Sequence, residues 1–121
     1  MNRERMMEVA DIIEAHPDNF FMGVYCSSTE LSKLSECGSH GCIAGWTVFL
    51  YQYKKPVDKF VPGWDIHERA RWLLGLTNKE AEDLFYARVF PNPEYLDDAQ
   101  WTADYLRRCA AAGEILKVEN A

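Results

Sequence analysis

The sequence lacks the long apolar run that a membrane-spanning helix needs. The stretch 37–53 carries no acidic or basic residue, but glycine, serine, histidine, threonine and glutamine interrupt it. A helix that crosses a bilayer requires about 20 predominantly apolar residues, so this stretch is too short and too polar. The first five residues carry charges of both signs, and no apolar segment of the kind found in secretory signals follows them. We therefore expect a soluble, cytoplasmic protein that does not bind membranes.

Basic residues are outnumbered by acidic ones. The 121 residues include 13 Lys and Arg against 19 Asp and Glu, which gives a formal net charge of −6. A general nucleic-acid binder needs a basic face for phosphate contacts, so direct nucleic-acid binding is not expected. With 48% apolar and 26% charged residues, the chain has the composition of a folded protein rather than a disordered one. Its length predicts a single domain over residues 1–121.

The pattern of apolar residues predicts a mainly α fold, a compact domain of about five helices. A helix at about 41–54 is apolar nearly all round, which is typical of a helix buried on several sides, so we place it at the centre. Ala44 and Gly45 would let another element approach its backbone closely. Residues 114–121 and the apolar segment 20–25 could add a minor two-stranded β patch. The other four helices are expected at about 3–15, 66–74, 78–90 and 98–112.

Local signals mark the ends of these helices. Thr77 followed by Glu80 fits a capping box, and Asp65 begins the preceding helix in a similar way. Asp97 or Asp98 is expected to cap the last helix, with Trp101, Tyr105, Cys109 and Ala112 on one face. Gly75 and Gly113 are suited to the left-handed conformation that ends a helix.

The segment 37–46 is the most informative one. Its run Cys-Gly-Ser-His-Gly-Cys-Ile-Ala-Gly-Trp resembles that of an uncharacterised family of small proteins from actinobacteria and their phages, which carry a Cys-Gly-x-x-x-Cys-Ile-Ala-Gly-Trp motif. Ser39 stands where Thr is expected in the relatives. Four further segments are similar: Leu74-Gly75-Leu76-Thr77, Glu80-Ala81, Leu84-Phe85 and Tyr105-Leu106-Arg107, followed by Gly113. The resemblance implies a phage or actinobacterial context and no particular reaction.

The motif has a structural interpretation and a metal-binding one. In the first, Ser39 caps the central helix, Gly38 and Gly41 adopt turn conformations, and Cys42 packs inward with Trp46. In the second, thiol and imidazole groups bind zinc, although the paired C-x2-C spacing of strong zinc motifs is missing. The candidate ligands are Cys26, Cys37, His40 and Cys42, with His67 as an alternative fourth.

A third interpretation makes Cys42 a nucleophile. A thiol near a helix N-terminus has its pKa lowered by the helix dipole. His40 or His67 could then act as the base, oriented by Asp65. Without a secretion signal, the fourth cysteine, Cys109, is expected to be free rather than part of a disulfide.

Acidic and aromatic residues in the second half of the chain indicate a binding surface. Aromatic side chains and arginine are favoured at protein interfaces. We therefore predict a protein-binding module with no catalytic activity and no cofactor, which, given the resemblance, would modulate or block a host protein. The alternatives are a small metal- or thiol-dependent enzyme and an acidic mimic of nucleic acid. The predicted partner-binding residues are Trp72, Arg69, Glu82, Asp83 and Tyr86.

Overall fold

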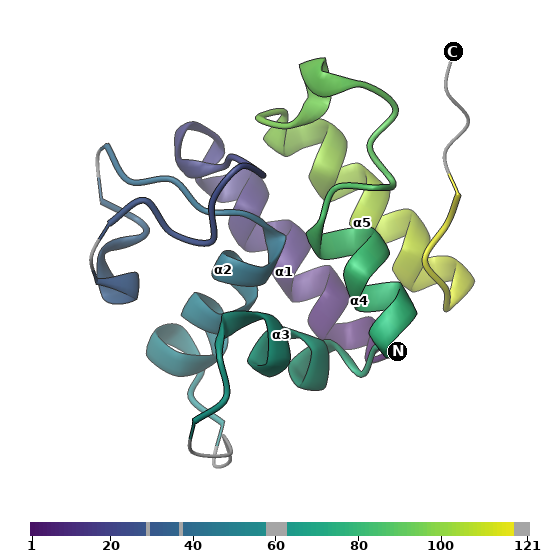
Figure 1. The fold of residues 1–121 in the computed structure, drawn as a ribbon, viewed down its shortest axis with the longest axis horizontal. Coiled ribbons are helices and arrows are strands. Elements are labelled where there is room, and N and C mark those ends of the chain that lie inside the picture. Colours follow the sequence, from purple (N-terminus) through teal and green to yellow (C-terminus); the bar gives the residue numbers. More distant parts are fainter. Residues whose placement is uncertain (29, 37, 58–62, 118–121) are drawn as a thin grey trace.

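The computed structural model describes residues 1–28, 30–36, 38–57 and 63–117. The described chain is mainly helical, as predicted, and its α-helices pack into a compact body (Figure 1). The five α-helices are α1 (Arg3–Ala15), α2 (Ile43–Phe49), α3 (Ile66–Leu74), α4 (Asn78–Phe85) and α5 (Ala99–Ala112). Shorter helical segments are η1 (Pro17–Asn19), η2 (Leu31–Lys33), η3 (Leu50–Lys54) and η4 (Pro93–Tyr95). Among the described residues, none of these helices has the length and apolar character needed to cross a membrane.

The predicted helix ends are confirmed where capping chemistry defines them, but the helix expected at about 78–90 ends at Phe85, before the left-handed Ala87. The side chain of Thr77 accepts a hydrogen bond from the backbone N–H of Glu80, and the Glu80 carboxylate accepts one from the N–H of Thr77. The Asp65 side chain caps α3 by accepting from the N–H of Glu68, and the Asp98 side chain caps α5 by accepting from the N–H of Trp101. Gly75, at φ 64°, ends α3 in the left-handed conformation that glycine adopts without strain.

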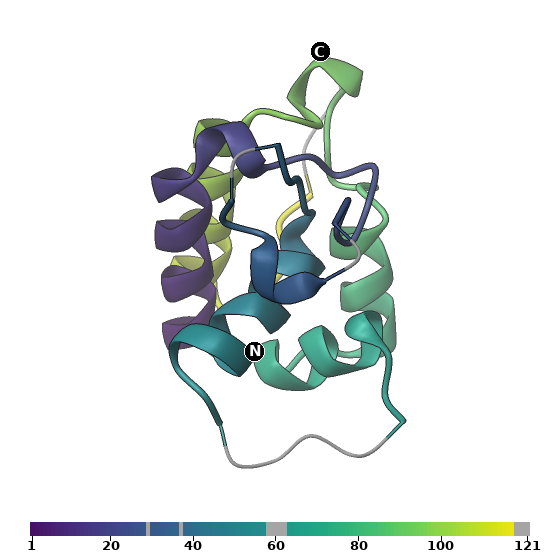
Figure 2. The same ribbon diagram turned by 90° about the vertical axis from the view of Figure 1, so that its left-hand side faces the viewer.

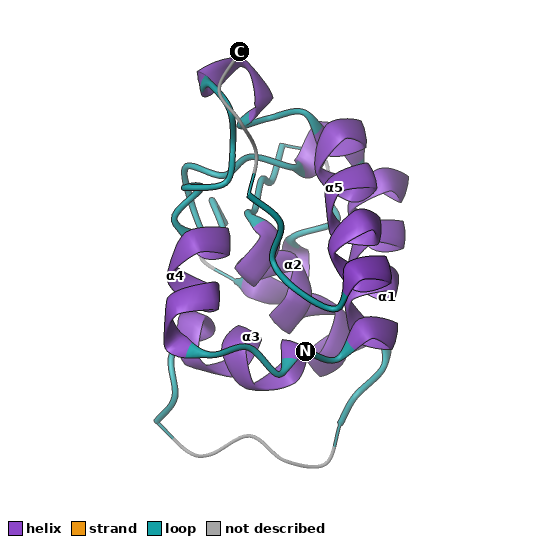
Figure 3. Ribbon diagram, turned by 90° about the vertical axis from the view of Figure 1, so that its right-hand side faces the viewer, coloured by secondary structure: helices purple, strands orange, loops and turns teal. Residues whose placement is uncertain are grey.

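The helices form two groups, and α2 contacts α1 in one group and α3 and α4 in the other. Helices α1 and α5 lie side by side, and α3 and α4 lie across from them (Figures 2 and 3). Every residue of α2 is buried, including Trp46 and the polar Thr47, whose hydroxyl donates to the carbonyl of Ile43. The chain continues past α2 as the π-helical turn η3, where Leu50 and Tyr51 remain buried.

The start of α2 differs from the sequence-based expectation. Cys42 is the residue that precedes the helix, and no side chain caps it. Ser39, which we expected to cap the helix, is instead buried, and its carbonyl accepts a hydrogen bond from Asn19 Nδ2 at 2.9 Å. The same Asn19 amide also donates to the carbonyl of Glu36, so one side chain binds two backbone carbonyls ahead of α2.

The expected β patch is not present in the described part of the chain. Phe20 and Gly41 form only an isolated parallel bridge, and residues 115–117 form no strand. The hydroxyl of Tyr105 donates to the carbonyl of Leu116, so the chain after α5 is held by a side chain rather than by strand pairing. Val118, which we had included in the expected strand, lies outside the described residues.

The apolar face of α5 also differs in detail from the prediction. Tyr105 and Cys109 are fully buried as expected, but Trp101 is half-buried and Ala112 is exposed. The last two residues of the helix, Ala111 and Ala112, are therefore exposed before Gly113 ends it at φ 74°.

Candidate functional site

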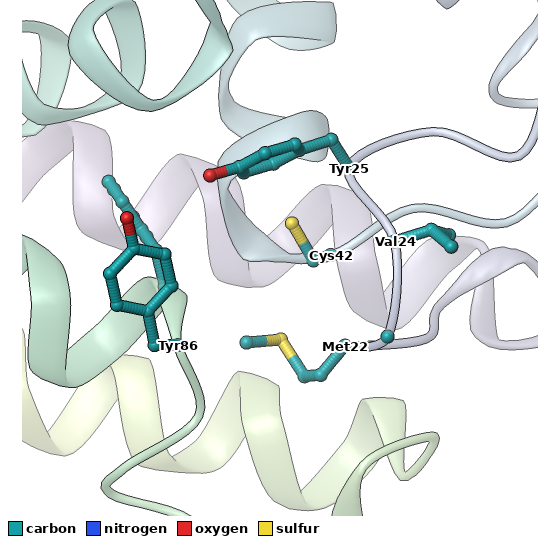
Figure 4. Close-up of a pocket in the computed structure, with 7 residues that line it drawn as sticks. Met22, Val24, Tyr25, Cys42 and Tyr86 are labelled. Carbon is teal, nitrogen blue, oxygen red and sulfur yellow. The ribbon is translucent and has the colours of Figure 1, made fainter.

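A pocket of about 330 Å³ opens between the segment 22–25 and the end of α4 (Figure 4). Its volume lies at the lower end of the range of about 300–1,000 Å³ that is typical of small-molecule sites. Most of its lining is apolar or aromatic. The residues that line it are Met22, Gly23, Val24, Tyr25, Cys42, Phe85 and Tyr86.

A glycine in the motif positions the first wall of this pocket. The backbone of Tyr25 lies directly on Gly45, where a Cβ atom would come within 2.9 Å of the Tyr25 carbonyl carbon and still closer to its oxygen. One turn earlier, the backbone N–H of Cys42 donates to the carbonyl of Val24 at 2.9 Å. The close approach that we expected at Gly45 is therefore made by the segment 22–25. Gly41 is also a point of close approach, to Tyr25 and Leu34, rather than the turn we expected there.

Cys42 lies at the back of the pocket, and only 2% of its surface is exposed. Burial raises the pKa of its thiol to about 11, and hydrogen bonds from the backbone around Ala44 and Gly45 oppose this only in part. The helix N-terminus does act in the expected direction, but desolvation of the thiolate outweighs it. The lowered pKa that we expected for a nucleophilic Cys42 is therefore not found.

The opposite wall comes from the end of α4. Phe85 is buried, whereas Tyr86 is 53% exposed and stands at the pocket mouth. The next residue, Ala87, has φ 60°, so the chain turns sharply away after Tyr86. The ring of His67 stacks on Tyr86 at a centroid distance of 5.4 Å and meets Phe85 edge-on at 5.3 Å.

Tyr25 stands across from Tyr86, and its hydroxyl points toward the Tyr86 side of the pocket (Figure 4). Burial, with smaller contributions from Tyr86, Cys42 and Asp65, raises the pKa of Tyr25 to about 12. The surroundings of this hydroxyl therefore disfavour a negative charge. Asp65, predicted to orient a catalytic histidine, instead caps α3 through its hydrogen bond to the N–H of Glu68.

In the described part of the chain, the candidate metal and catalytic residues are not assembled around one centre. His40 lines a separate pocket of about 550 Å³ with Phe20, Phe21 and Asp97, while Cys42 lines the first one. The Cys26 thiol lies 3.9 Å from the carbonyl of Glu30. Among the residues that the structure describes, no group of three or more His, Cys, Asp or Glu side chains could hold a metal ion. Cys37 lies outside the described residues, so its part in the proposed zinc set is not described.

His67, the other candidate base and ligand, is not among the residues that line the pocket. It packs against two residues that do, Phe85 and Tyr86. Its Nδ1 atom is buried and has no hydrogen-bond partner in the described part of the chain. Its ring contacts are with Phe85 and Tyr86. His67 thus acts on the pocket by holding the Tyr86 ring.

The predicted partner-binding residues lie in two different settings. Trp72 is 41% exposed, and its neighbours are the Arg5 guanidinium, 5.9 Å from the ring centroid, and Trp64. Arg69 donates to Gln52 Oε1 at 3.2 Å. Tyr86, in contrast, is part of the pocket mouth.

The two acids of the predicted set are engaged within the chain. The Nη1 atom of Arg88 lies 3.4 Å from Glu82 Oε2 and 3.6 Å from Asp83 Oδ1. The Nζ atom of Lys79 lies 2.9 Å from Asp83 Oδ1. The ion pair with Lys79 holds the pKa of Asp83 below its ordinary value. These carboxylates therefore carry local partners instead of forming an unneutralised acidic face.

Sequence reasoning did not assign Met22, Val24, Tyr25 or Phe85 to a site. These residues meet because a loop contacts the end of a helix that lies much further along the chain. The separation in sequence from residue 25 to residue 85 is 60 residues. The available signal was Gly45, which indicated a close approach but not the segment that makes it. A comparison of the chain with protein-family models, curated proteins and solved structures finds no match.

Proposed function

We propose that this chain is a protein-binding module without chemistry of its own, and that the pocket beside Cys42 receives a side chain of the partner. In this proposal the segment 41–54 is the central helix that carries the pocket. The family resemblance supports a phage or actinobacterial origin, with a cytoplasmic host protein as the partner.

The observation that carries the proposal is the exposure of large apolar side chains around the pocket. Val24 and Tyr25 are each 37% exposed, and Tyr86 is 53% exposed. Single exposed apolar residues are common on protein surfaces, but a group of them around a concave pocket is typical of an interaction site. Tyrosine is also enriched among the residues that contribute most to binding energy.

The two other hypotheses have less support. A thiol enzyme needs a thiolate near neutral pH, and the pKa of Cys42 is raised instead. Its nearest sequence candidate for a base, His40, lines another pocket. A nucleic-acid mimic needs an unneutralised acidic surface, and Glu82 and Asp83 are paired with Arg88.

The proposal is tested by photo-crosslinking from a single position. A benzoylphenylalanine placed at Tyr86 should form an adduct with one protein in an actinobacterial lysate, and excess unlabelled wild-type chain should suppress it. The matched control is the same residue at Tyr53, another exposed tyrosine, in η3 rather than at the pocket. Identical adducts from both positions, or none from position 86, would contradict the proposal.

A further inference from the structure

We propose that the pocket is an aromatic cage for an alkylammonium group that the partner presents. This inference rests on the proposed protein-binding function and specifies the chemistry of the group that enters.

Three aromatic rings and two sulfur atoms surround the open space. Tyr25 and Tyr86 stand on two sides, and the side chains of Met22 and Cys42 also line the space (Figure 4). The third ring in the lining is that of Phe85. The face of an aromatic ring carries negative charge density, so a cation within about 6 Å of a ring centroid is attracted to it. A methyl-bearing ammonium group also contacts the apolar lining, which a strongly hydrated ion does not.

The charges around the pocket favour a cation over an anion. Among the described residues, the seven that line it include no lysine, arginine or histidine. Asp65 places a negative charge close enough to act on the Tyr25 hydroxyl from outside the pocket. The net charge of −6 acts in the same direction at longer range.

The Tyr86 ring is held in position before any ligand arrives. His67 stacks on it at 5.4 Å, and the Arg88 guanidinium lies 5.8 Å from its centroid. Arg88 is itself paired with Glu82 and Asp83, so its positive charge is largely offset near the pocket. A ring fixed in this way loses little conformational freedom on binding, which favours affinity.

The experiment is a pair of NMR titrations of the isotopically labelled full chain. The probes are choline and dimethylbutanol, the neutral alcohol in which carbon replaces the quaternary nitrogen, at matched ionic strength. We expect choline to shift the amide signals of residues 22–25 and 85–86, and the alcohol to bind about 3- to 30-fold more weakly.

Two variants complete the test. Tyr86→Leu removes the ring but keeps an apolar side chain, so it should weaken choline binding by a similar factor, whereas Tyr86→Phe should preserve it. The exposure of Tyr86 makes both variants compatible with folding, and the dispersion of the NMR spectrum checks this. Equal binding of choline and the alcohol would overturn the cage while leaving a protein-binding pocket for an apolar group. The absence of shifts with either probe would also overturn it, and the crosslinking experiment decides the binding function independently.

Discussion

Two groups of aromatic residues in this molecule have similar composition and opposite organisation. Beside α5, the indole of Trp101 is surrounded by Phe90, Tyr95 and Tyr105 at centroid distances of 5.0, 5.1 and 5.2 Å. At the pocket, the rings of Tyr25, Phe85 and Tyr86 line about 330 Å³ of open space. In the first cluster the Trp101 side chain lies between the other rings, whereas in the second the space between the rings is open. Aromatic content alone therefore does not indicate a binding site. A site is indicated when the space between the rings is left open by the chain's own side chains.

The largest difference in stability between the two clusters is expected when one ring of each is replaced by alanine. Tyr105→Ala removes a fully buried ring and should lower the free energy of unfolding by about 3–5 kcal/mol, as for other large buried side chains. Tyr86→Ala should cost less, about 1 kcal/mol, because 53% of that residue is exposed and the ring loses only its contacts with His67 and Arg88. Urea unfolding of both variants measures the difference, and similar losses would mean that Tyr86 is a structural residue.

Each cluster also has a cysteine, Cys42 at the pocket and Cys109 in α5. Alkylation rates compare how accessible the two thiols are. The pKa of Cys42 is raised to about 11 from an ordinary value of 9.0, so its thiolate fraction at neutral pH is reduced about a hundredfold. Because the folded state holds the proton, the alkylation rate should rise with pH until about pH 11. Burial raises the pKa of Cys109 as well.

Mass spectrometry of the modified chain should give the order Cys26, then Cys42, then Cys109, with the half-buried Cys26 the fastest. Rapid modification of Cys42 at neutral pH would contradict its description as a buried thiol and revive the nucleophile hypothesis.

The pocket should depend on Gly45 in a way that the closed cluster does not. In a helix, Gly→Ala ordinarily stabilises by about 0.5–1 kcal/mol. Here the added methyl group would displace the Tyr25 backbone, and overpacking of this kind costs about 1–3 kcal/mol. We expect Gly45→Ala to be destabilising and to shift the NMR signals of residues 22–25, with those of α5 unchanged.

Gly38→Ala is the control for this substitution. Gly38 has φ +87° and open space around it, so its variant should lose stability through backbone strain and leave the pocket signals in place. A stabilising Gly45→Ala would show that the segment 22–25 moves aside freely.

The smallest effect is expected from removing single hydroxyl groups. Tyr105→Phe loses the hydrogen bond to the carbonyl of Leu116 and should cost about 0.5–1.5 kcal/mol. Tyr86→Phe should have a smaller effect on stability, because 53% of that residue is exposed. Thermal unfolding of the two variants side by side is the check, and a loss confined to Tyr86→Phe would reverse the comparison.

Features defined by neighbours in the sequence could be predicted, and features defined by distant contacts could not. The capping box at Thr77, the Asp98 cap and the left-handed Gly75 each depend on a few consecutive residues. Ser39 had the right chemistry for a cap, but the hydrogen bonds of Asn19 hold it elsewhere. Nothing near Tyr25 in the sequence indicates Phe85 or Tyr86, because their meeting is decided by how α4 packs against α2.

The turn after Tyr86 has a thermodynamic consequence. A left-handed alanine lies about 1–2 kcal/mol above the same residue in a right-handed conformation, and glycine would relieve most of that strain. Ala87 is held at φ 60° beside the exposed ring, so the chain stores strain energy at the mouth of its pocket. Such strain is concentrated in proteins where geometry serves binding rather than folding. Ala87→Gly is thus a stabilising substitution that the native sequence does not have, at the residue that sets the direction of the chain after Tyr86.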